Sequence, residues 1–233
     1  MIPLRDNAAP RRLTPVNVAL IAVNLAVFVY ELSLGARVAA FVEKFALVPT
    51  AVTQAFTIGT HRNLATLAPL MTTVTSMFVH GGFWHIAGNM LYLFIFGAAV
   101  EYRMGAARYL IFYCAAGIAA ALATVWIAPE SSVPVIGASG AIAGVLGAYF
   151  ILYPRGRILT ILPIFVFIQF IEIPAVIYLF VWFAAQLYAG VEQSGRAAAM
   201  GGVAWWAHVG GFMFGIALGP MLAINRPRRR GAR

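Results

Sequence analysis

Charged residues are scarce in this sequence, and their scarcity argues against a water-facing surface. Only 10% of the 233 residues are Asp, Glu, Lys or Arg, whereas 62% are hydrophobic. A soluble domain carries about 25% charged residues. The mean hydropathy is +0.88. A soluble domain, a disordered chain and a fibrous repeat are therefore disfavoured, and a polytopic membrane protein whose outer face is solvated by lipid is predicted.

Cysteine and acidic residues are also rare. The single cysteine, Cys114, excludes an intrachain disulfide and a cysteine-based metal cluster, and its apolar surroundings are typical of a small core residue. The formal net charge is +9, but the basic residues gather at the two ends of the chain. Arg5, Arg11 and Arg12 lie near the start, and five of the sixteen lie in the last eight positions. This distribution indicates cytoplasmic anchors and no nucleic acid as partner.

Long apolar runs are what the sequence does contain. A helix that crosses a ~30 Å hydrocarbon core needs about 20 residues. Six spans are expected on this basis: Val16–Leu34, Phe83–Val100, Ala106–Ala128, Ala138–Tyr153, Ile173–Gly190 and Val203–Ile224. The predicted fold class is thus an all-α membrane protein. Residues 35–70 are too polar to span and form an interfacial loop, in which the spacing of Val38, Phe41, Phe45 and Val48 predicts a surface-lying helix.

The distribution of charge predicts the topology. With six spans and the N-terminus inside, twelve basic residues lie inside and four outside, which favours cytoplasmic termini. The expected organisation is an N-terminal tail (1–15), a membrane domain (16–224) and a basic C-terminal tail (225–233). The short apolar stretch at 158–172 is interpreted as a connection partly immersed on the cytoplasmic side. An extension of the fourth span and a seventh span are the alternatives, although a seventh span would place the basic tail outside.

Polar residues at membrane depth are costly, so each is a functional candidate. His85 and Asn89 are four residues apart at the start of the second span, on one helix face. Ser139 lies in the segment Gly137-Ala138-Ser139-Gly140 at the start of the fourth span, and His208 lies early in the sixth. These three spans all enter from the outer side. The sequence therefore predicts that the four polar side chains meet at one depth.

Their chemistry is complementary. Serine becomes a nucleophile when a base takes its proton, and His208 is the candidate base for Ser139. His85, Asn89 and the backbone N–H of Ser139 are donors that could stabilise a developing oxyanion. Glycines support a close approach of the fourth and sixth spans, because Gly140 follows the serine and Gly211 and Gly215 share the face of His208.

The same polar residues could also belong to proteins of other classes, which do not use a serine nucleophile. Each polar residue taken alone is more often structural, and only their joint placement favours a site. No acidic residue has a motif that would complete a catalytic triad, so a serine–histidine dyad is the simpler prediction. A metal site from His80, His85 and His208 is disfavoured because no HExxH motif and no nearby carboxylate accompanies them. A transporter or channel would need polar residues through the full membrane depth.

Together, these residues and the segments around them resemble the rhomboid family of intramembrane serine proteases. The resemblance covers roughly residues 70–223. The matching segments are His80-Gly-Gly-Phe-Trp-His85-Ile-Ala-Gly-Asn89, Val100-Glu101-Tyr-Arg103-Met-Gly105, Gly137-Ala-Ser139-Gly140 and Ala207-His208-Val-Gly-Gly211 with Gly215. They occur in the order of the family's motifs. The combination is highly specific, although the Gly-x-Ser-Gly segment alone is weak.

The resemblance implies a six-helix bundle whose water-filled cavity opens outward. It implies Ser139 as nucleophile, His208 as general base, and His85, Asn89 and the Ser139 amide as the oxyanion hole, with no cofactor. His80 would be structural, and Glu101 with Arg103 would form a polar lock. The substrates would be transmembrane proteins in the lipid bilayer, cleaved near its outer face, and a bacterial inner membrane is the expected location. A catalytically inactive relative that binds membrane clients is the competing member of the same family.

Overall fold

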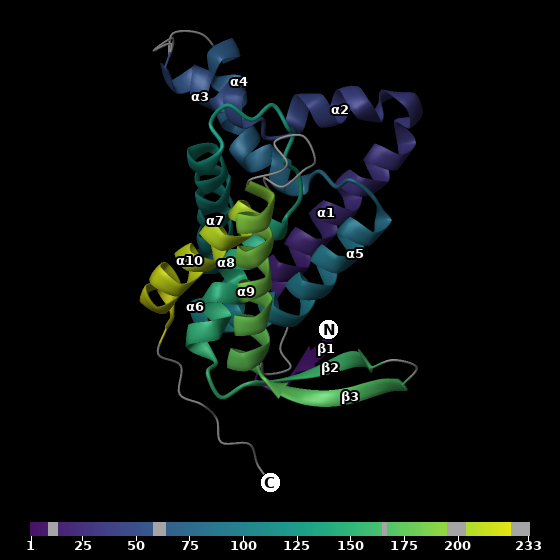
Figure 1. Ribbon diagram of the computed structural model, residues 1–233, viewed down its shortest axis with the longest axis vertical. Helices are drawn as coiled ribbons and strands as arrows, with labels where there is room; N and C mark the ends of the chain where they lie inside the picture. The colour runs from purple at the N-terminus through teal and green to yellow at the C-terminus, as the bar shows by residue number, and fades with distance from the viewer. Residues whose placement is uncertain (9–13, 58–63, 165–166, 195–203, 225–233) are drawn as a thin grey trace.

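The computed structural model of the protein describes residues 1–8, 14–57, 64–164, 167–194 and 204–224. It is mainly helical, with one three-stranded sheet at one end of the helical bundle (Figure 1). The predicted basic tail at 225–233 lies outside the described residues.

Four helices in the described part of the chain are long and apolar enough to cross a membrane. They are α1 (Pro15–Ser33), a continuous helix over Phe83–Met104, α7 (Ala106–Ile127) and the segment Ala175–Glu192 of α9 (Ala175–Ser194). The continuous helix comprises α5 (Phe83–Tyr92), a π-helical turn at Leu93–Gly97 and α6 (Ala98–Met104). The expected count of six spans and the orientation of the termini stay predictions.

The other two expected spans are α8 (Ser139–Leu152) and α10 (Ala204–Leu222). The 14 residues of α8 form a helix about 21 Å long, shorter than the hydrocarbon core. This helix packs against α7, α9 and α10, and ten of its residues are buried, from Gly140 to Tyr149. It is therefore the central helix of the bundle, and Figure 1 shows it among these three neighbours.

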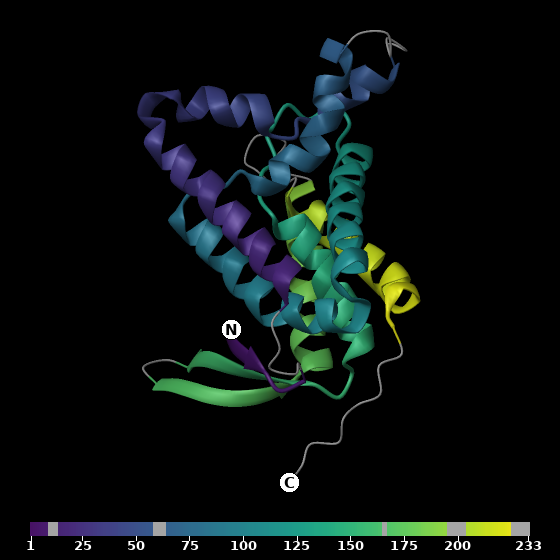
Figure 2. The ribbon, with the colours of Figure 1, turned by 180° about the vertical axis from the view of Figure 1, so that it is seen from behind.

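The described residues 35–57 and 64–78 form short helices at the end of the bundle away from the sheet, as the two opposite views show (Figures 1 and 2). The elements are a 3₁₀ turn (Gly35–Arg37), α2 (Val38–Phe45), α3 (Pro49–Thr57) and α4 (Leu64–Thr75), followed by a 3₁₀ turn at Ser76–Phe78. The helix predicted from the spacing of Val38, Phe41, Phe45 and Val48 is confirmed as α2, but it ends at Phe45, so Val48 lies outside it.

The all-α prediction is confirmed in part: the chain is mainly helical, but it also contains an antiparallel sheet in the order β1-β2-β3. Its strands are β1 (Ile2–Asp6), β2 (Arg157–Ile164) and β3 (Phe167–Pro174). The stretch at 158–172 is thus a β-hairpin, neither an extension of α8 nor a seventh helical span. Both runs contain three isoleucines, and the second also contains two phenylalanines, side chains that favour strands; each run is only eight residues long.

The N-terminal segment is part of the same sheet and so is no free tail. Ile2 pairs with Ile161 and Asp6 with Ile158, and the side-chain oxygen Oδ1 of Asn7 accepts the backbone N–H of Arg157 at 2.8 Å. The faces of β3 are exposed and apolar at Phe167, Ile168 and Phe170. Whether this hairpin enters the membrane, as the sequence suggests, stays a prediction.

Candidate active site

Ser139 is the first residue of α8. This helix begins short of the far end of α7, its neighbour in the bundle. Arg103 Nη1 donates to the carbonyl oxygen of Leu152, so the end of α8 lies beside the junction of α6 and α7. From that junction α7 runs for 22 residues and α8 runs back for only 14. At 1.5 Å per residue, α8 stops roughly 12 Å short of the far end of α7. The serine hydroxyl is thus placed inside the bundle, at a helix N-terminus whose first N–H groups have no intrahelical acceptor.

His208 comes from α10, and the distance between the two helices is set by glycine. A Cβ atom on Gly211 would clash with the carbonyl oxygen of Gly140, and one on Gly215 would clash with that of Gly144. The two backbones therefore touch, as the glycine spacing predicted. This contact places Nε2 of His208 2.8 Å from Oγ of Ser139, which is hydrogen-bonding distance.

Gln186 on α9 is a member of the site that the sequence did not reveal. Its Oε1 lies 2.7 Å from Nδ1 of His208, and the residue is buried. Trp182, one turn earlier on the same helix, places its ring 5.9 Å from the imidazole, and the ring of Trp205 is 6.0 Å away. One glutamine in an apolar helix carries no motif. Its spacing of four residues from Trp182 gives only a shared helix face.

His85 and Asn89 lie on the first turns of α5. They share one helix face, as their spacing of four residues predicts. Gly81 donates its backbone N–H to Nδ1 of His85 at 3.3 Å, so the ring proton is assigned to Nε2. Asn89 is buried, and within the described part of the chain its Nδ2 has no hydrogen-bond partner. Both side chains thus hold a donor that is not assigned to another protein group.

Gly137 explains how these donors approach the serine segment. Its φ of +114° is a conformation that side chains rarely adopt. A Cβ there would stand 2.6 Å from Nε2 of His85 and 3.5 Å from Nδ2 of Asn89. Glycine is therefore required both by the backbone conformation and by the close approach of the histidine ring.

A cavity of about 300 Å³ joins these groups. Its polar lining comes from α5, α8 and α10 and includes Tyr92 as well as the four predicted residues His85, Asn89, Ser139 and His208. Its apolar wall includes Ile142, Leu146 and Trp182. The structure thus brings together all four polar residues that the sequence placed at one depth.

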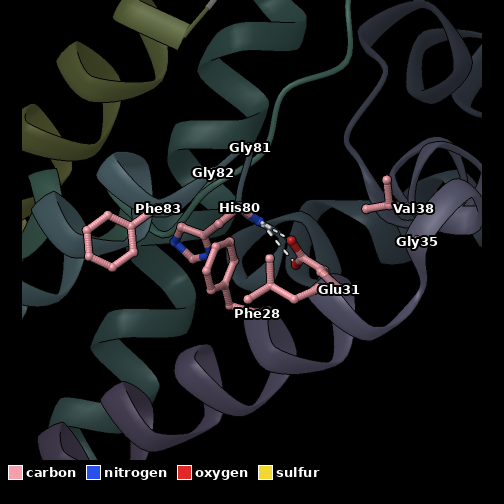
Figure 3. A pocket seen from close by; sticks show the side chains of 9 residues that line it. Phe28, Glu31, Gly35, Val38, His80, Gly81, Gly82 and Phe83 are labelled. Atoms are coloured by element: carbon pink, nitrogen blue, oxygen red, sulfur yellow. Dashed lines mark hydrogen bonds between the residues drawn. The ribbon is translucent and has the colours of Figure 1, made fainter.

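His80 lies in the turn before α5, and Glu31 holds it there. Like Gln186, Glu31 carries no sequence motif. Both carboxylate oxygens of Glu31, on α1, accept the backbone N–H of His80, at 3.2 and 3.3 Å (Figure 3). The two residues border a second cavity, of about 400 Å³, together with Phe28 and Phe83. Burial, with a smaller contribution from neighbouring His85, lowers the pKa of His80 to about 4, so its ring is neutral at pH 7. His80 is therefore packed, and its backbone is tethered by Glu31. The structural role expected for His80 stays a prediction.

Glu101 and Arg103 hold two different helix ends. Glu101 accepts the backbone N–H groups of Val16 and Asn17, the first turn of α1, at 3.2 and 2.7 Å. Arg103 donates to the last turn of α8, as described above, and its own carbonyl oxygen accepts the N–H of Ile224 at 2.7 Å. The described ends of the chain therefore lie at one end of the bundle, beside the sheet.

The residues in the described part of the chain offer no group of three or more His, Cys, Asp or Glu side chains that could hold a metal ion. Cys114 is a free thiol on α7.

The fold and the site together define a multi-pass membrane protein with a serine–histidine pair at the start of its central helix. The chain belongs to the rhomboid family, because the family model for the Rhomboid domain matches residues 68–225. Members of this family are integral membrane proteins and generally intramembrane serine proteases, although some relatives are catalytically inactive.

Three curated relatives are similar to this chain. "Rhomboid protein 1, mitochondrial" of Saccharomyces cerevisiae is 31% identical over 69% of the chain and 44% of its own length. "Rhomboid protease GluP" of Bacillus subtilis is 44% identical over 32% of the chain and 14% of its length. "Presenilin-associated rhomboid-like protein, mitochondrial" of Bos taurus is 31% identical over 60% of the chain and 35% of its length. The chain thus spans less than half of each relative.

Proposed function

We propose that this protein is a serine endopeptidase that hydrolyses peptide bonds of transmembrane protein substrates. The observation that carries the proposal is the 2.8 Å contact between Nε2 of His208 and Oγ of Ser139 inside a cavity that also presents His85 and Asn89. A nucleophile, a base and unengaged donors within one cavity are the parts that acyl transfer requires.

The first half of the reaction forms an acyl-enzyme. Oγ of Ser139 attacks the carbonyl carbon of the substrate while its proton passes to Nε2 of His208. The carbonyl oxygen becomes an oxyanion, which can accept from Nδ2 of Asn89, Nε2–H of His85 and the backbone N–H of Ser139. The C–N bond then breaks, and His208 gives its proton to the leaving amine.

The second half restores the serine. A water molecule attacks the ester carbon while His208 takes one of its protons. The tetrahedral intermediate collapses, the bond to Oγ breaks, and the proton returns to Ser139. The products are a new carboxyl end and the intact enzyme. The cavity is the route by which water would reach an ester that is otherwise enclosed by helices.

The proposed position of cleavage is near the outer face of the membrane. The Ser139 end of α8 is opposite the end that carries the sheet, where the described chain termini lie. If the arginine-rich chain ends are cytoplasmic, as their charge predicts, Ser139 faces the other side. A bacterial inner membrane stays the proposed location; two of the relatives have mitochondrial names.

An inactive client-binding relative is the second candidate within the family. Two observations favour the enzyme over it. Both Ser139 and His208 are present, and their side chains lie within hydrogen-bonding distance of each other. A binding protein would gain nothing from a hydroxyl held against an imidazole lone pair.

Labelling with a fluorophosphonate separates these candidates, because the reagent bonds covalently to an activated serine. We expect purified wild-type protein to be labelled at Ser139, located by peptide mass spectrometry. We also expect it to cleave a single-span model substrate in proteoliposomes. Ser33→Ala is the matched control, since Ser33 lies on the exposed end of α1. Absence of labelling together with absence of cleavage would favour the inactive relative, and chelator-sensitive cleavage would favour a metal mechanism.

A further inference from the structure

The second ring nitrogen of His208 is engaged by an atom that can only accept. Nδ1 lies 2.7 Å from Oε1 of Gln186, and an amide oxygen has lone pairs but no hydrogen. The proton of the neutral imidazole must therefore sit on Nδ1. Nε2 is left with a free lone pair, and this is the atom that faces Oγ of Ser139 at 2.8 Å.

We infer that Gln186 is a positioning residue, which fixes the tautomer and the ring orientation of His208 so that Nε2 can take the serine proton. The inference rests on the proposed function. It assigns to a neutral amide the orienting work that a carboxylate performs in a Ser-His-Asp triad. The sequence offered no acidic residue for this place, and the structure supplies an acceptor from α9 instead.

The location explains why an amide is suitable. Gln186 is 9% exposed, on a helix that is apolar and long enough to span the membrane. A carboxylate held there would have to leave water for a low-dielectric site, and the cost of burying the ion would oppose folding. An amide oxygen orients the ring without that cost, and its dipole still favours the charge that forms on the imidazole.

The assigned amide orientation is the one that the proposed reaction requires. If the amide were reversed, its NH₂ group would donate to Nδ1, and the ring proton would move to Nε2. Nε2–H could then only donate to Oγ of Ser139, and no ring nitrogen would be left to take the serine proton. The assigned orientation is the one in which the hydrogen bonds run from Ser139 through His208 to Gln186, with Nε2 as the acceptor that the proposed reaction requires. The rings of Trp182 and Trp205, at 5.9 and 6.0 Å, restrict rotation of the imidazole out of this chain.

Gln186→Met tests the inference, because methionine keeps the length of the side chain and removes the amide acceptor. Loss of one neutral hydrogen bond corresponds to a rate loss of about tenfold. We expect kcat for a transmembrane model substrate to fall by about that factor, with KM and the melting temperature in detergent nearly unchanged. The rate of fluorophosphonate labelling at Ser139 should fall by the same factor, because labelling uses the same proton transfer.

Two further variants separate orientation from packing. Gln186→Glu keeps an acceptor at Nδ1 and should recover most of the lost kcat. Gln169→Leu is the matched control, since Gln169 lies exposed on β3, and it should behave as wild type. If Gln186→Glu does not fold, the comparison of kcat, KM and labelling rate in Gln186→Met decides alone.

Two outcomes overturn the inference about Gln186 alone, and a third refutes the proposed function on which it rests. Wild-type kcat in Gln186→Met would show that the hydrogen bond does not matter. A parallel change in KM and melting temperature in Gln186→Met would show a packing role. Failure of wild-type protein to label at Ser139, or cleavage that persists in Ser139→Ala, would instead refute the proposed function itself.

Discussion

Two polar clusters lie in this bundle, and they use their hydrogen bonds in opposite ways. The sheet-end cluster consists of Asn17, Glu101 and Tyr109. Within it the hydroxyl of Tyr109 donates to Oδ1 of Asn17 at 2.8 Å, Nδ2 of Asn17 donates to the Leu93 carbonyl at 3.0 Å, and Glu101 accepts from the first turn of α1. Every side-chain polar atom of these three residues is engaged with the protein.

The serine cluster consists of His85, Asn89, Ser139, Gln186 and His208. Its hydroxyl–imidazole–amide chain is complete, but Nδ2 of Asn89 has no partner in the described part of the chain. A buried donor without a partner costs free energy that the rest of the fold must offset. The comparison separates two uses of polar groups: the paired groups of the sheet-end cluster join helices, whereas in the proposed reaction the unpaired Nδ2 of Asn89 is available to an atom of the substrate.

The largest expected effect comes from Ser139→Ala. Removing the nucleophile should lower the rate of substrate cleavage by on the order of 10⁶-fold. The fold should persist, because alanine fits a helix start that already holds small neighbours. Cleavage of a model substrate in proteoliposomes measures the first effect and thermal melting in detergent the second. Activity near that of wild type would show that the serine cluster is structural, like the sheet-end cluster.

The next largest effect is expected from Asn89→Ala, which removes the unpaired donor. Loss of one oxyanion donor costs about 10²–10³ in kcat, and the loss here should be at most of this size because other donors and water can substitute. KM should change little, since the donor acts on charge that forms in the transition state. Asn24→Ala is the control, as a buried amide on α1 away from the serine. A raised KM at unchanged kcat would assign Asn89 to substrate binding or packing.

Gly211→Leu should reduce activity by roughly 10² or more, although glycine does no chemistry. The added side chain would push α10 away from the Gly140 carbonyl, and a displacement of about 1 Å between reacting groups can cost on the order of 10²-fold. Ala217→Leu makes a similar increase in size on the exposed face of the same helix and should be tolerated. Equal activities of the two variants would mean that the glycine contact does not set the distance from Ser139 to His208.

Tyr109→Phe should have the smallest effect on catalysis. It removes one hydrogen bond of the sheet-end cluster and leaves Oδ1 of Asn17 without that partner. We expect a loss of about 1–2 kcal/mol in the free energy of unfolding. The kcat of the folded protein should stay at the wild-type value. A reduced kcat at unchanged stability would contradict the separation of the two clusters.

The four polar residues at one depth were predictable because their signals are local. His85 and Asn89 share a helix face by spacing alone, and Ser139 and His208 each begin a glycine-rich stretch that allows close packing. Even Gly137, whose positive φ is visible only in the structure, was identified by its place next to the serine.

Three features could not be read from the sequence. The sheet depends on pairing Ile2–Asp6 with a hairpin about 150 residues away, and the apolar hairpin alone resembles an immersed connection. Glu31 carries no motif, because its partner is a backbone N–H that bears no sequence signal. Gln186 was hidden for a similar reason, since a single amide has many uses in a helix.

The sequence by itself determined that the chain is a membrane protein, where its long apolar helices lie, and which polar side chains gather in the cavity. These properties follow from composition, run length and residue type, which act locally along the chain. Only the tertiary structure decided which acceptor meets Nδ1 of His208 and which carboxylate tethers the turn before His85. Those choices depend on how separate helices pack, and a hydrogen bond is specific to within a few tenths of an ångström, which no pattern of residue types can encode.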